Sequence, residues 1–542
     1  MTAPRNSAAS GAPRNGATPG ASLNAQRRER ELAEVAELSS HQPVDVLVVG
    51  GGVTGAGIAL DAATRGLSVV LAEKHDLAFG TSRWSSKLVH GGLRYLASGA
   101  VGIARESAVE RGILIERTAP HLVRPLAQVV PLLPSVSGPH AALVRAGFAA
   151  GDVLRATAGT SARTLPRSRR ISADEVRRLA PTVRVDGLRG GLLAFDGQLG
   201  DDARLVVALA RTAAAHGARI LTRCAAEQLT GTGAVLRDEL SGTRYDVPAR
   251  IVINAAGVWA GELSPGVTLR PSRGTHLVLA SESFGGLTAG LTVPVPGSSS
   301  RFVFALPSPE GRVYVGLTDE DAPGPIPDVP VASETEIGFL LNTVNSVLER
   351  PLARTDVLGT YSGLRPLLDT GATGGTGQSG STADISRKHA VLVAADGLTT
   401  IVGGKLTTYR RMAQDALDAA LAHTTALADT ELNAGRCRTE RLPLVGAASW
   451  RELDALPAPA RLIRRYGTEA TDVLALAAGD DALREPIADG IDATMAELIF
   501  AVRHEGALDE SDLLDRRTRI GLVDADRTRA LPAARAALAL SD

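Results

Sequence analysis

Short apolar runs alternate with helix-forming segments from residue 45 onward, and this order predicts an α/β fold. Residues 45–50 (DVLVVG) form an apolar run of strand type, residues 54–65 are compatible with a helix, and residues 68–72 form a second apolar run. A strand, a tight glycine turn, a helix and a second strand make up the opening unit of a doubly wound sheet. This part of the chain is therefore expected to be a Rossmann-type nucleotide-binding domain.

The middle of the chain continues with both helical and strand periodicities. Ser172 and Glu175 have the spacing of a capping box, which predicts a helix that runs to about Leu179. The apolar pattern predicts three further elements, which are a helix at 201–216 and strands at 218–224 and 250–257. Residues 270–320 alternate in the β manner with turn residues between the runs, as expected for an antiparallel sheet that covers a substrate.

Composition divides the chain into three parts. Residues 1–43 are rich in Ala, Gly, Ser, Pro and Asn and are predicted to be a disordered tail. Residues 44–431 are expected to contain the discontinuous nucleotide-binding domain, interleaved with the sheet domain at about 90–200 and 265–370. From residue 432 to 542 the pattern becomes helical and amphipathic, which predicts a separate C-terminal helical domain.

Three smaller features follow from local composition. Residues 28–39 are compatible with one short polar helix inside the tail. The segments 322–330, rich in Pro, and 370–384, rich in Gly, Ser and Thr, are predicted to be surface loops.

Charge and cysteine content narrow the function classes. The 58 Lys and Arg residues nearly balance 59 Asp and Glu residues, which argues against a nucleic-acid-binding surface. Cys224 and Cys437 are the only cysteines, so neither a disulfide scaffold nor a Cys-rich metal site is expected, and a reducing, cytoplasmic compartment fits. His389 and the acid pairs 201–202 and 480–481 have no metal-ligand pattern and are predicted to be surface or capping residues. No apolar stretch reaches the roughly 18 residues of a spanning helix.

The segment Gly50–Gly55 (GGGVTG) satisfies the pattern G-x-G-x-x-G after a strand and at the start of a helix. Residues without a side chain let the backbone approach a pyrophosphate, and a helix N-terminus offers N–H groups and a positive dipole end. Glu73 lies 18 residues beyond Gly55, where a carboxylate accepts hydrogen bonds from ribose hydroxyls. This fingerprint predicts a dinucleotide but does not distinguish NAD from FAD.

Segment 80–95 (GTSRWSSKLVHGGLRY) combines hydroxyl side chains, one Lys, one His and a glycine pair, as suits a chain in contact with a polar ligand. Three later motifs accompany it: Asn254–Trp259 (NAAGVW), Tyr361–Pro366 (YSGLRP) and Gly403–Tyr409 (GGKLTTY). In this combination the chain resembles the flavin-linked glycerol-3-phosphate dehydrogenases of the aerobic, quinone-linked, membrane-associated type. These belong to the D-amino-acid-oxidase-like flavoprotein superfamily, and the resemblance spans about residues 44 to 530.

The resemblance implies a fold and an activity. The fold would be α/β, with a Rossmann-type FAD-binding domain, an antiparallel-sheet substrate domain and a C-terminal helical domain. The activity would be FAD-dependent oxidation of sn-glycerol 3-phosphate to dihydroxyacetone phosphate by hydride transfer to flavin. Electrons would pass to a membrane quinone, which implies peripheral contact with the inner face of the cell membrane.

The matching motif positions imply the contacts with FAD. They are Gly50, Gly51, Gly52, Thr54, Gly55, Glu73, Thr81, Ser82, Ser86, Lys87, Leu88, Ala256, Gly257, Gly404, Lys405, Leu406 and Thr407. Lys87 and Lys405 also stand out because the chain has 54 arginines and only four lysines, which indicates sites that the wider guanidinium does not fit. The helix start at residue 406 is expected to face the flavin pyrimidine, where its dipole and Lys405 stabilise negative charge.

A phosphomonoester carries nearly two negative charges, and planar guanidinium groups match its oxygens bidentately. By resemblance, Arg94, Arg365 and Arg387 occupy the positions of such a clamp, and Lys405 also contacts a substrate oxygen. Tyr95 either hydrogen-bonds to the substrate or packs with its ring. In a chain with 54 arginines, the alternative for each arginine is a solvated surface residue.

Oxidation of the alcohol also requires removal of the hydroxyl proton, and histidine has a pKa suited to that role. His90 lies in the motif expected beside the isoalloxazine, so it is the candidate base. The alternatives are a His90 that only positions flavin or substrate, and a proton relay through Lys405 or Arg365.

Three other functions share some of these features. A glycerol-3-phosphate oxidase would use the same fold and pass electrons to oxygen. An amine or amino-acid oxidase of the superfamily would need one Arg for a carboxylate instead of a cluster of three. A flavin-binding protein without turnover would not need the set His90, Arg365 and Lys405.

Residues 140–155 (HAALVRAGFAAGDVLR) are apolar with sparse Arg. Such a segment fits either a helix at a membrane interface or an ordinary buried helix, of which we favour the buried helix. The sequence leaves the oligomeric state open, with a homo-oligomer among the options.

Overall fold

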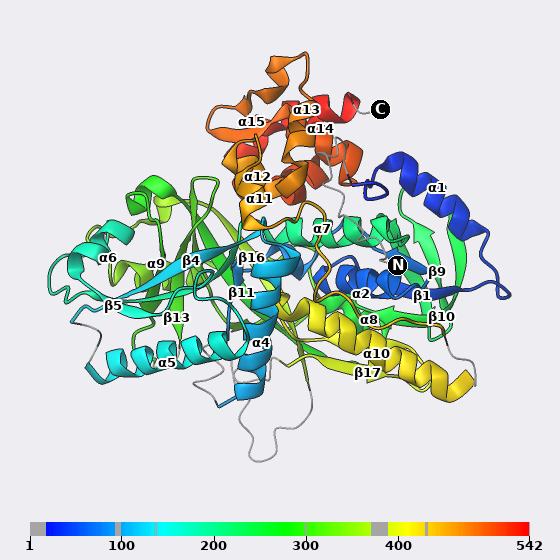
Figure 1. Ribbon diagram of the computed structural model, residues 1–542, viewed down its shortest axis with the longest axis horizontal. Helices are drawn as coiled ribbons and strands as arrows, with labels where there is room; N and C mark the ends of the chain where they lie inside the picture. Colours follow the sequence, from blue (N-terminus) through cyan, green and yellow to red (C-terminus); the bar gives the residue numbers. More distant parts are fainter. Residues whose placement is uncertain are drawn as a thin grey trace, which may run out of the picture.

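Two large β-sheets lie side by side, and a helical region formed by the C-terminal part of the chain lies above them (Figure 1). The computed structural model describes residues 18–92, 99–134, 136, 138–298, 301–369, 388–428 and 432–540. The chain passes repeatedly from one sheet to the other, so each sheet is assembled from segments that are far apart in sequence.

The first sheet is parallel at its centre, with the strand order β18-β10-β1-β2-β7. These strands are β1 (Val44–Val49), β2 (Val69–Ala72), β7 (Arg219–Leu221), β10 (Arg244–Asn254) and β18 (Thr399–Val402). Three more strands make antiparallel pairs: β8 (Cys224–Thr230), β9 (Gly233–Asp238) and β17 (Ala390–Val393). Both faces of β1 and β2 are buried, which explains their continuous apolar sequences. The predicted Rossmann-type domain is confirmed.

Three helices cover one face of this sheet: α2 (Val53–Thr64), α7 (Asp202–Ala215) and α10 (Tyr409–Ala428). They share one apolar core with the strands, to which Ile58 and Leu205 contribute fully buried side chains. Helix α7 begins at Asp201, whose carboxylate accepts hydrogen bonds from two N–H groups of the first turn. The helices predicted at 54–65 and 201–216 are thus confirmed within one residue at each end.

Helix α1 (Ala25–Ala36) corrects the predicted N-terminal tail. Leu32 and Val35 are buried and join the apolar cluster on the opposite face of the first sheet. The short helix predicted at 28–39 is thus confirmed with slightly earlier bounds, whereas the disorder predicted for residues 1–43 is wrong for residues 18–43. The apolar positions of this segment are few, but they are spaced to meet one surface that only the folded sheet provides.

The second sheet has the strand order β15-β11-β14-β13-β12-β4-β6-β3, with β16 beside β11 and β5 beside β6. Its strands are β3 (Leu88–Val89), β4 (Val123–Pro131), β5 (Arg169–Ile171), β6 (Gly191–Leu199), β11 (Leu269–Ala280), β12 (Gly290–Pro294), β13 (Phe302–Pro307), β14 (Arg312–Gly316), β15 (Glu320–Asp321) and β16 (Val357–Leu368). The pairs are antiparallel except for the parallel pair β12–β4, so the predicted antiparallel substrate sheet is confirmed with one parallel pair within it.

Helices α6 (Ala173–Leu179) and α9 (Glu334–Asn345) pack against the second sheet. The predicted capping box at the start of α6 is confirmed in part, because the Ser172 side chain accepts a hydrogen bond from the N–H of Glu175. Val176 of α6 and Leu340 of α9 are fully buried in the core of this sheet.

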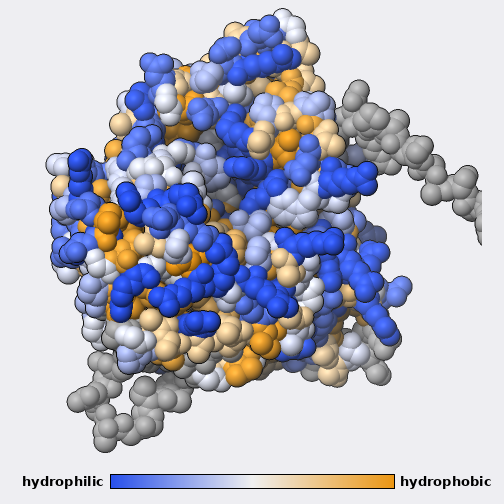
Figure 2. All heavy atoms as spheres, turned by 60° about the vertical axis from the view of Figure 1, so that its left-hand side comes forward, coloured by the Kyte–Doolittle hydropathy of each residue, from blue (hydrophilic) through white to orange (hydrophobic). Residues whose placement is uncertain are grey.

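Helix α5 (Gly138–Thr157) lies on the surface rather than in a core. Leu143 and Val153 are 57% and 62% exposed, whereas Val144 and Phe148 pack against a small apolar cluster. The preference for a buried helix at 140–155 is therefore wrong, because only one face of the helix meets the protein. Figure 2, in which this side of the molecule comes forward, shows apolar residues along the lower edge. Within the described ranges, no helix combines the length and the apolar character needed to cross a membrane.

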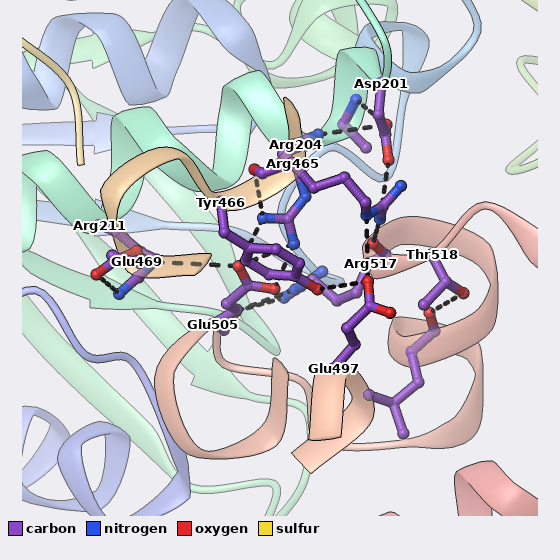
Figure 3. A network of polar contacts seen from close by, with 12 residues as sticks. Asp201, Arg204, Arg211, Arg465, Tyr466, Glu469, Glu497, Glu505, Arg517 and Thr518 are labelled. Atoms are coloured by element: carbon purple, nitrogen blue, oxygen red, sulfur yellow. Dashed lines mark hydrogen bonds and ion pairs between the residues drawn. The ribbon is translucent and has the colours of Figure 1, made fainter. Parts of the chain in front are cut away.

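The C-terminal part is mainly helical, with one hairpin, and its predicted boundary at residue 432 stays a prediction. Its helices are α11 (Trp450–Asp454), α12 (Ala460–Tyr466), α13 (Ala470–Ala475), α14 (Met495–His504) and α15 (Asp524–Ala539), and the hairpin joins β19 (Pro486–Ala488) to β20 (Ile491–Thr494). A layer of buried charges joins it to α7 (Figure 3), and we call this layer the charged seam. The seam comprises Arg204, Arg211, Arg465, Glu469, Glu497 and Glu505.

Candidate active site

The glycine loop between β1 and α2 is shaped by contacts that exclude side chains. A Cβ atom on Gly55 would lie 1.8 Å from the carbonyl oxygen of Gly50, and one on Gly51 would lie 2.8 Å from the Cβ of Glu73. Gly50 also has a φ of +110°, which favours glycine. The loop therefore presents a bare backbone directly before the N-terminus of a helix, the arrangement that binds phosphate groups.

The start of α2 is joined to the segment that follows β2. Gly52 is the N-cap of the helix and Thr54 lies in its first turn. The N–H of Val53 donates to Oγ of Ser82 at 2.9 Å. Ser82, which was predicted to contact FAD from a motif 30 residues downstream of the loop, thus lies at the helix N-terminus.

Glu73 lies where the fingerprint requires an acid. Its Oε2 accepts a hydrogen bond from the N–H of Gly51 at 2.6 Å, and its Oε1 accepts one from the N–H of His75 at 2.8 Å. Burial raises the pKa of the Glu73 carboxyl, and the two N–H groups act in the opposite direction. The carboxylate is therefore held next to the loop at the end of β2.

The motif Asn254–Trp259 borders the same loop from β10. The Oδ1 atom of Asn254 accepts a hydrogen bond from the N–H of Ala256 at 3.2 Å, which closes the turn after the strand. Gly257 has a φ of +60° and open space around its Cβ position. The predicted contacts Ala256 and Gly257 therefore lie at the carboxyl end of a strand next to β1, where ligands bind in this fold class.

Segment 80–92 connects this loop to the second sheet. Oγ1 of Thr81 donates to the carbonyl oxygen of Leu364 on β16 at 2.7 Å. Oγ of Ser86 lies within hydrogen-bond distance, 2.8 Å, of Nε2 of His276 on β11. The segment predicted to contact flavin is thus anchored to the two strands that form the substrate side.

Lys87 has a different environment from the one predicted. Its ammonium lies 3.1 Å from Oδ2 of Asp202, and it also donates to the carbonyl oxygens of Ser85 and Arg83. These acceptors match the three hydrogens of an ammonium, and the side chain is fully buried. The side chain therefore serves a buried ion pair. The backbone N–H of Lys87 donates to Oγ of Ser85, its carbonyl oxygen accepts from the N–H of Leu199, and the predicted contact of Lys87 with FAD stays a prediction. Asp202 is correspondingly buried rather than at the surface, and Asp201 is the cap.

The other residues predicted to be at the surface or to cap helices have different environments in the structure. Asp480 caps a helical turn by accepting a hydrogen bond from the N–H of Ala482 at 3.1 Å, and Asp481 is exposed. His389 is mostly covered, and its Nε2 lies 2.9 Å from the carboxylate of Asp415.

Arg365 is held on β16 by three acceptors. Nη1 donates to Oγ of Ser272 and to Oδ1 of Asp319, each at 3.2 Å, and Nη2 donates to the carbonyl oxygen of Thr318 at 3.1 Å. Its side chain is 21% exposed. A guanidinium fixed in this way keeps its planar fork in one orientation, which is the property that phosphate recognition requires.

His90 and Lys405 meet around helix α4 (Val101–Ile113). Nζ of Lys405 donates to Oγ of Ser107 on this helix. The turn after β3 packs on the same side chain, since a Cβ atom on Gly92 would lie 3.3 Å from Ser107 Oγ. The N–H of Gly92 donates to Nδ1 of His90 at 3.3 Å. The turn that follows His90 and the side chain of Lys405 therefore both contact Ser107.

The predicted turn before α10 is present. Gly403 and Gly404 have φ values of +77° and +69°, and a Cβ atom on Gly404 would lie 2.4 Å from Sδ of Met412. Leu406 and Thr407 follow in the 3₁₀ turn that leads into the helix. Leu88 lies opposite, at the start of β3, whose strand contacts this turn.

Arg94, Tyr95 and Arg387 lie outside the described residues, as does the segment 370–384. The predicted phosphate-binding group of Arg94, Arg365 and Arg387 therefore stays a prediction. Arg365 is the member of it that the structure describes.

His276 is a site residue that sequence reasoning missed. It is buried on β11, stacks on Tyr361 with ring centroids 4.7 Å apart, and bonds to Ser86. Burial, with the nearby charges of Lys87 and Arg365, holds the pKa of His276 well below 6.5. In the sequence, His276 stands in the β-alternating segment 270–320 that was predicted to form the substrate sheet. That pattern fits a histidine buried in the core as well as a histidine in the active site.

Comparison with known proteins identifies the family. Residues 45–410 match the family model of FAD dependent oxidoreductases, and residues 437–540 match the C-terminal domain of alpha-glycerophosphate oxidase. The chain is 59% identical over 522 residues to Glycerol-3-phosphate dehydrogenase 1 of Mycobacterium tuberculosis, covering 95% of this chain and 98% of that protein. This chain belongs to the FAD-dependent glycerol-3-phosphate dehydrogenases.

Other members of the family agree with the fold. Glycerol-3-phosphate dehydrogenase 2 of Mycobacterium tuberculosis is 37% identical over 505 residues, covering 88% of this chain and 81% of that protein. The X-ray structure of the glycerol-3-phosphate dehydrogenase from Bacillus halodurans complexed with FAD has a TM-score of 0.70 and 27% identity, covering 95% and 94% of the two chains. The predicted α/β fold with a C-terminal helical region is therefore confirmed.

The glycine loop itself fits FAD. Its own neighbours exclude side chains at Gly51 and Gly55, and the carboxylate of Glu73 is held beside the bare backbone. A dinucleotide needs this combination, because its pyrophosphate approaches the backbone while its ribose hydroxyls donate to an acid.

Proposed function

We propose that this chain oxidises sn-glycerol 3-phosphate to dihydroxyacetone phosphate, with FAD as its cofactor and a membrane quinone as the electron acceptor. The observation that carries the proposal is the anchoring of segment 80–92, next to the glycine loop, to the strands that hold Arg365 and His276. This arrangement occurs in a chain that is 59% identical to a named glycerol-3-phosphate dehydrogenase.

FAD supplies a two-electron acceptor for the hydride that leaves the carbinol carbon of the substrate. The chain holds this cofactor with the glycine loop, the N-terminus of α2 and the carboxylate of Glu73. Lys405 lies at the turn before α10. Its positive charge and the N-terminus of the helix would face the pyrimidine end of the bound flavin, where they would stabilise the negative charge of the reduced ring.

The phosphate of the substrate binds to Arg365, with Arg94 and Arg387 as proposed partners. Asp319 and Thr318 already hold the guanidinium of Arg365, so little side-chain entropy is lost when the phosphate binds. Lys405 contacts a hydroxyl oxygen of the substrate, and Tyr95 is a further proposed contact.

His90 takes the proton of the substrate hydroxyl. It lies in the segment expected to contact flavin, and the turn that follows it packs on Ser107, which accepts a hydrogen bond from Lys405. A different imidazole, that of His276, is hydrogen-bonded to Ser86, and burial holds its pKa well below 6.5. A His90→Gln variant should therefore lose the pH dependence of flavin reduction, whereas a His276→Asn variant should keep it.

Anaerobic titration of the purified holoenzyme with sn-glycerol 3-phosphate tests the activity. Loss of the visible absorbance of oxidised flavin at stoichiometric substrate is the expected result. An unchanged spectrum would exclude the substrate assignment and would favour a flavin-binding protein without turnover, while the cofactor assignment would stand.

A second measurement tests the electron acceptor. Substrate-dependent reduction of a soluble quinone that is much faster than oxygen consumption supports the dehydrogenase, and the reverse ratio supports an oxidase. An amino-acid oxidase would tolerate Arg387→Gln, because a carboxylate needs a single guanidinium, whereas the proposed phosphate clamp would not.

We also propose that α5 is the surface that contacts the membrane. Its exposed side carries Leu143 and Val153, which are 57% and 62% exposed, and an amphipathic surface helix with apolar side chains in solvent suits a membrane interface. The double variant Leu143→Gln and Val153→Gln should sediment less with anionic phospholipid vesicles, while its activity with a soluble acceptor is unchanged. Equal sedimentation of the variant and the wild type would exclude α5.

A further inference from the structure

The C-terminal region contacts the FAD-binding part of the chain directly. We propose that Arg516, Arg517 and Arg519 position segment 73–87 against the glycine loop and so set how tightly FAD is retained. We call these three residues the arginine clamp. The inference rests on FAD binding by this chain, and it assigns to the C-terminal region a role in cofactor retention.

On one side, segment 73–87 is bonded to the glycine loop and the start of α2. Glu73 accepts a hydrogen bond from the N–H of Gly51 at 2.6 Å, and the N–H of Ala78 donates to the carbonyl oxygen of Gly51 at 3.0 Å. Ser82 accepts from the N–H of Val53 at 2.9 Å. The segment is therefore one wall of the dinucleotide site.

On the other side, the same segment is held by the arginine clamp. Nε of Arg516 lies 2.6 Å from Oδ2 of Asp76, and Arg517 forms two hydrogen bonds with the same carboxylate at 2.7 Å and 2.8 Å. Nη2 of Arg519 donates to the carbonyl oxygen of Arg83 at 2.6 Å. All five residues are buried, so these bonds are shielded from water.

The ionisation of Asp76 agrees with this geometry. Burial alone would raise its pKa, but Arg517 and Arg516 hold the pKa of Asp76 below its ordinary value. The carboxylate is therefore charged at neutral pH, and it ties the turn directly after Glu73 to the C-terminal region.

The backbone departs from regular geometry both in the part of the C-terminal region that carries the arginine clamp and in segment 73–87. Residues Asp512–Arg517 form a π-helical turn, and Arg519 has a φ of +64°. In the segment itself, Ala78 and Lys87 have φ values of +61° and +56°. π-helical turns are often found at functional sites, and left-handed residues other than glycine persist only where the surroundings enforce them.

The contact also reaches the strand of Arg365. The guanidinium of Arg519 lies 5.1 Å from the ring of Trp84, and Trp84 packs in a small apolar cluster with Tyr361 of β16 and Leu522. The C-terminal region thus contacts both segment 73–87 and the strand that carries Arg365.

A general contribution to stability is the alternative to this proposal, and the charged seam offers a matched control. Arg211 of α7 forms a buried ion pair with Glu469 of the C-terminal region, at 2.6 Å (Figure 3). This pair has the same chemistry and burial as the arginine clamp. Among the described residues, none of its hydrogen bonds reaches segment 73–87.

The experiment measures release of FAD from the holoenzyme. Wild type and the single variants Arg517→Met, Arg519→Met and Arg211→Met are diluted into buffer, and recovery of flavin fluorescence gives the release rate. We expect release to be about tenfold faster for the two clamp variants, the change expected when a buried hydrogen bond from a charged group is lost, and within about twofold of wild type for Arg211→Met. Amide hydrogen exchange of residues 73–87 should increase in the clamp variants only.

Equal acceleration in the clamp variants and in Arg211→Met would overturn the proposal, because it would show that the C-terminal region only adds stability. An unchanged rate of FAD release from Arg519→Met would also overturn the proposal. Because Arg519→Met leaves both ion pairs of Asp76 intact, it still tests the proposal if Arg517→Met does not fold. A wild-type protein that contains no FAD and binds none would refute the cofactor assignment itself, a result distinct from a failure of the clamp.

Discussion

Arginine performs opposite tasks in two regions of this molecule. In the charged seam, Arg204 and Arg211 face Glu505 and Glu469, and at most 6% of each of these side chains is exposed. On the substrate sheet, Arg365 pairs with the carboxylate of Asp319 and is 21% exposed. The seam arginines are neutralised within the fold, whereas Arg365 is oriented by its neighbours and still reaches solvent.

The difference shows that burial and pairing, rather than residue type, separate a structural arginine from a ligand-binding one. Removal of one partner from a buried pair leaves an uncompensated charge, so its cost falls on folding. Removal of a partly exposed guanidinium that is aimed at a ligand has a cost that falls on binding. The two regions should therefore respond differently to the same kind of substitution.

The largest effect is expected in the seam. Arg204→Met leaves the buried carboxylate of Glu505 without its bidentate partner and should lower the free energy of unfolding by about 3–5 kcal/mol. Guanidinium chloride unfolding measures this change. The control is Arg169→Met, which breaks an exposed pair with Glu175 and should leave the free energy of unfolding close to that of the wild type. Equal costs for the two variants would contradict the comparison.

Arg365→Gln should have the next largest effect, on substrate binding. Loss of its proposed phosphate contact should weaken the binding of sn-glycerol 3-phosphate by about 2–4 kcal/mol, with a much smaller change in the free energy of unfolding. The apparent dissociation constant comes from anaerobic flavin reduction at a series of substrate concentrations. If stability falls while substrate binding is unchanged, Arg365 belongs with the structural arginines.

The pH dependence of stability should separate the two regions. The pKa of His276 is held well below 6.5 by burial, so below pH 6.5 the unfolded chain takes up a proton that the folded chain does not. Stability is therefore lost as the pH falls below this value, by about 1.4 kcal/mol per pH unit for one proton. His276→Asn should reduce the slope of unfolding free energy against pH between pH 5 and 6.5 by that amount.

Within the seam, the ion pair of Glu497 should respond to acid only at lower pH. Glu497, whose pKa is lowered chiefly by Arg461 against the effect of burial, contributes stability above its ordinary pKa of 4.5. That contribution is lost as the pH falls through the lower pKa of the folded state. In Glu497→Gln, the slope of unfolding free energy against pH should change below pH 4.5 and stay unchanged between pH 5 and 6.5. This result would show that the seam and the His276 site respond to acid in different pH ranges.

The smallest effect is expected at Ser107. Ser107→Ala removes a hydroxyl that accepts a hydrogen bond from the ammonium of Lys405 and should slow flavin reduction by about 1–2 kcal/mol in activation free energy. Stopped-flow absorbance measures the rate, and thermal unfolding should stay close to that of the wild type. An unchanged rate would show that Lys405 does not depend on α4 for its position.

The FAD-binding half of the fold was predictable because its signals are local. The run before Gly50, the glycine spacing and the position of Glu73 each reflect a backbone constraint within one β-α-β unit, and the structure confirms the predicted elements. Lys87 and α5 were not predictable in the same way. The Lys87 motif does not reveal Asp202 more than a hundred residues away, and periodicity in α5 does not show which faces other elements cover.

The sequence by itself determined the glycine loop, the family motifs and the balance of charge, because these depend on residue type and short spacing. Only the tertiary structure decided which of the 54 arginines are paired inside the fold, because their carboxylate partners come from other parts of the chain. It also decided that the C-terminal region meets the FAD segment at Asp76, since a contact between residues 76 and 517 exists only after the chain has folded.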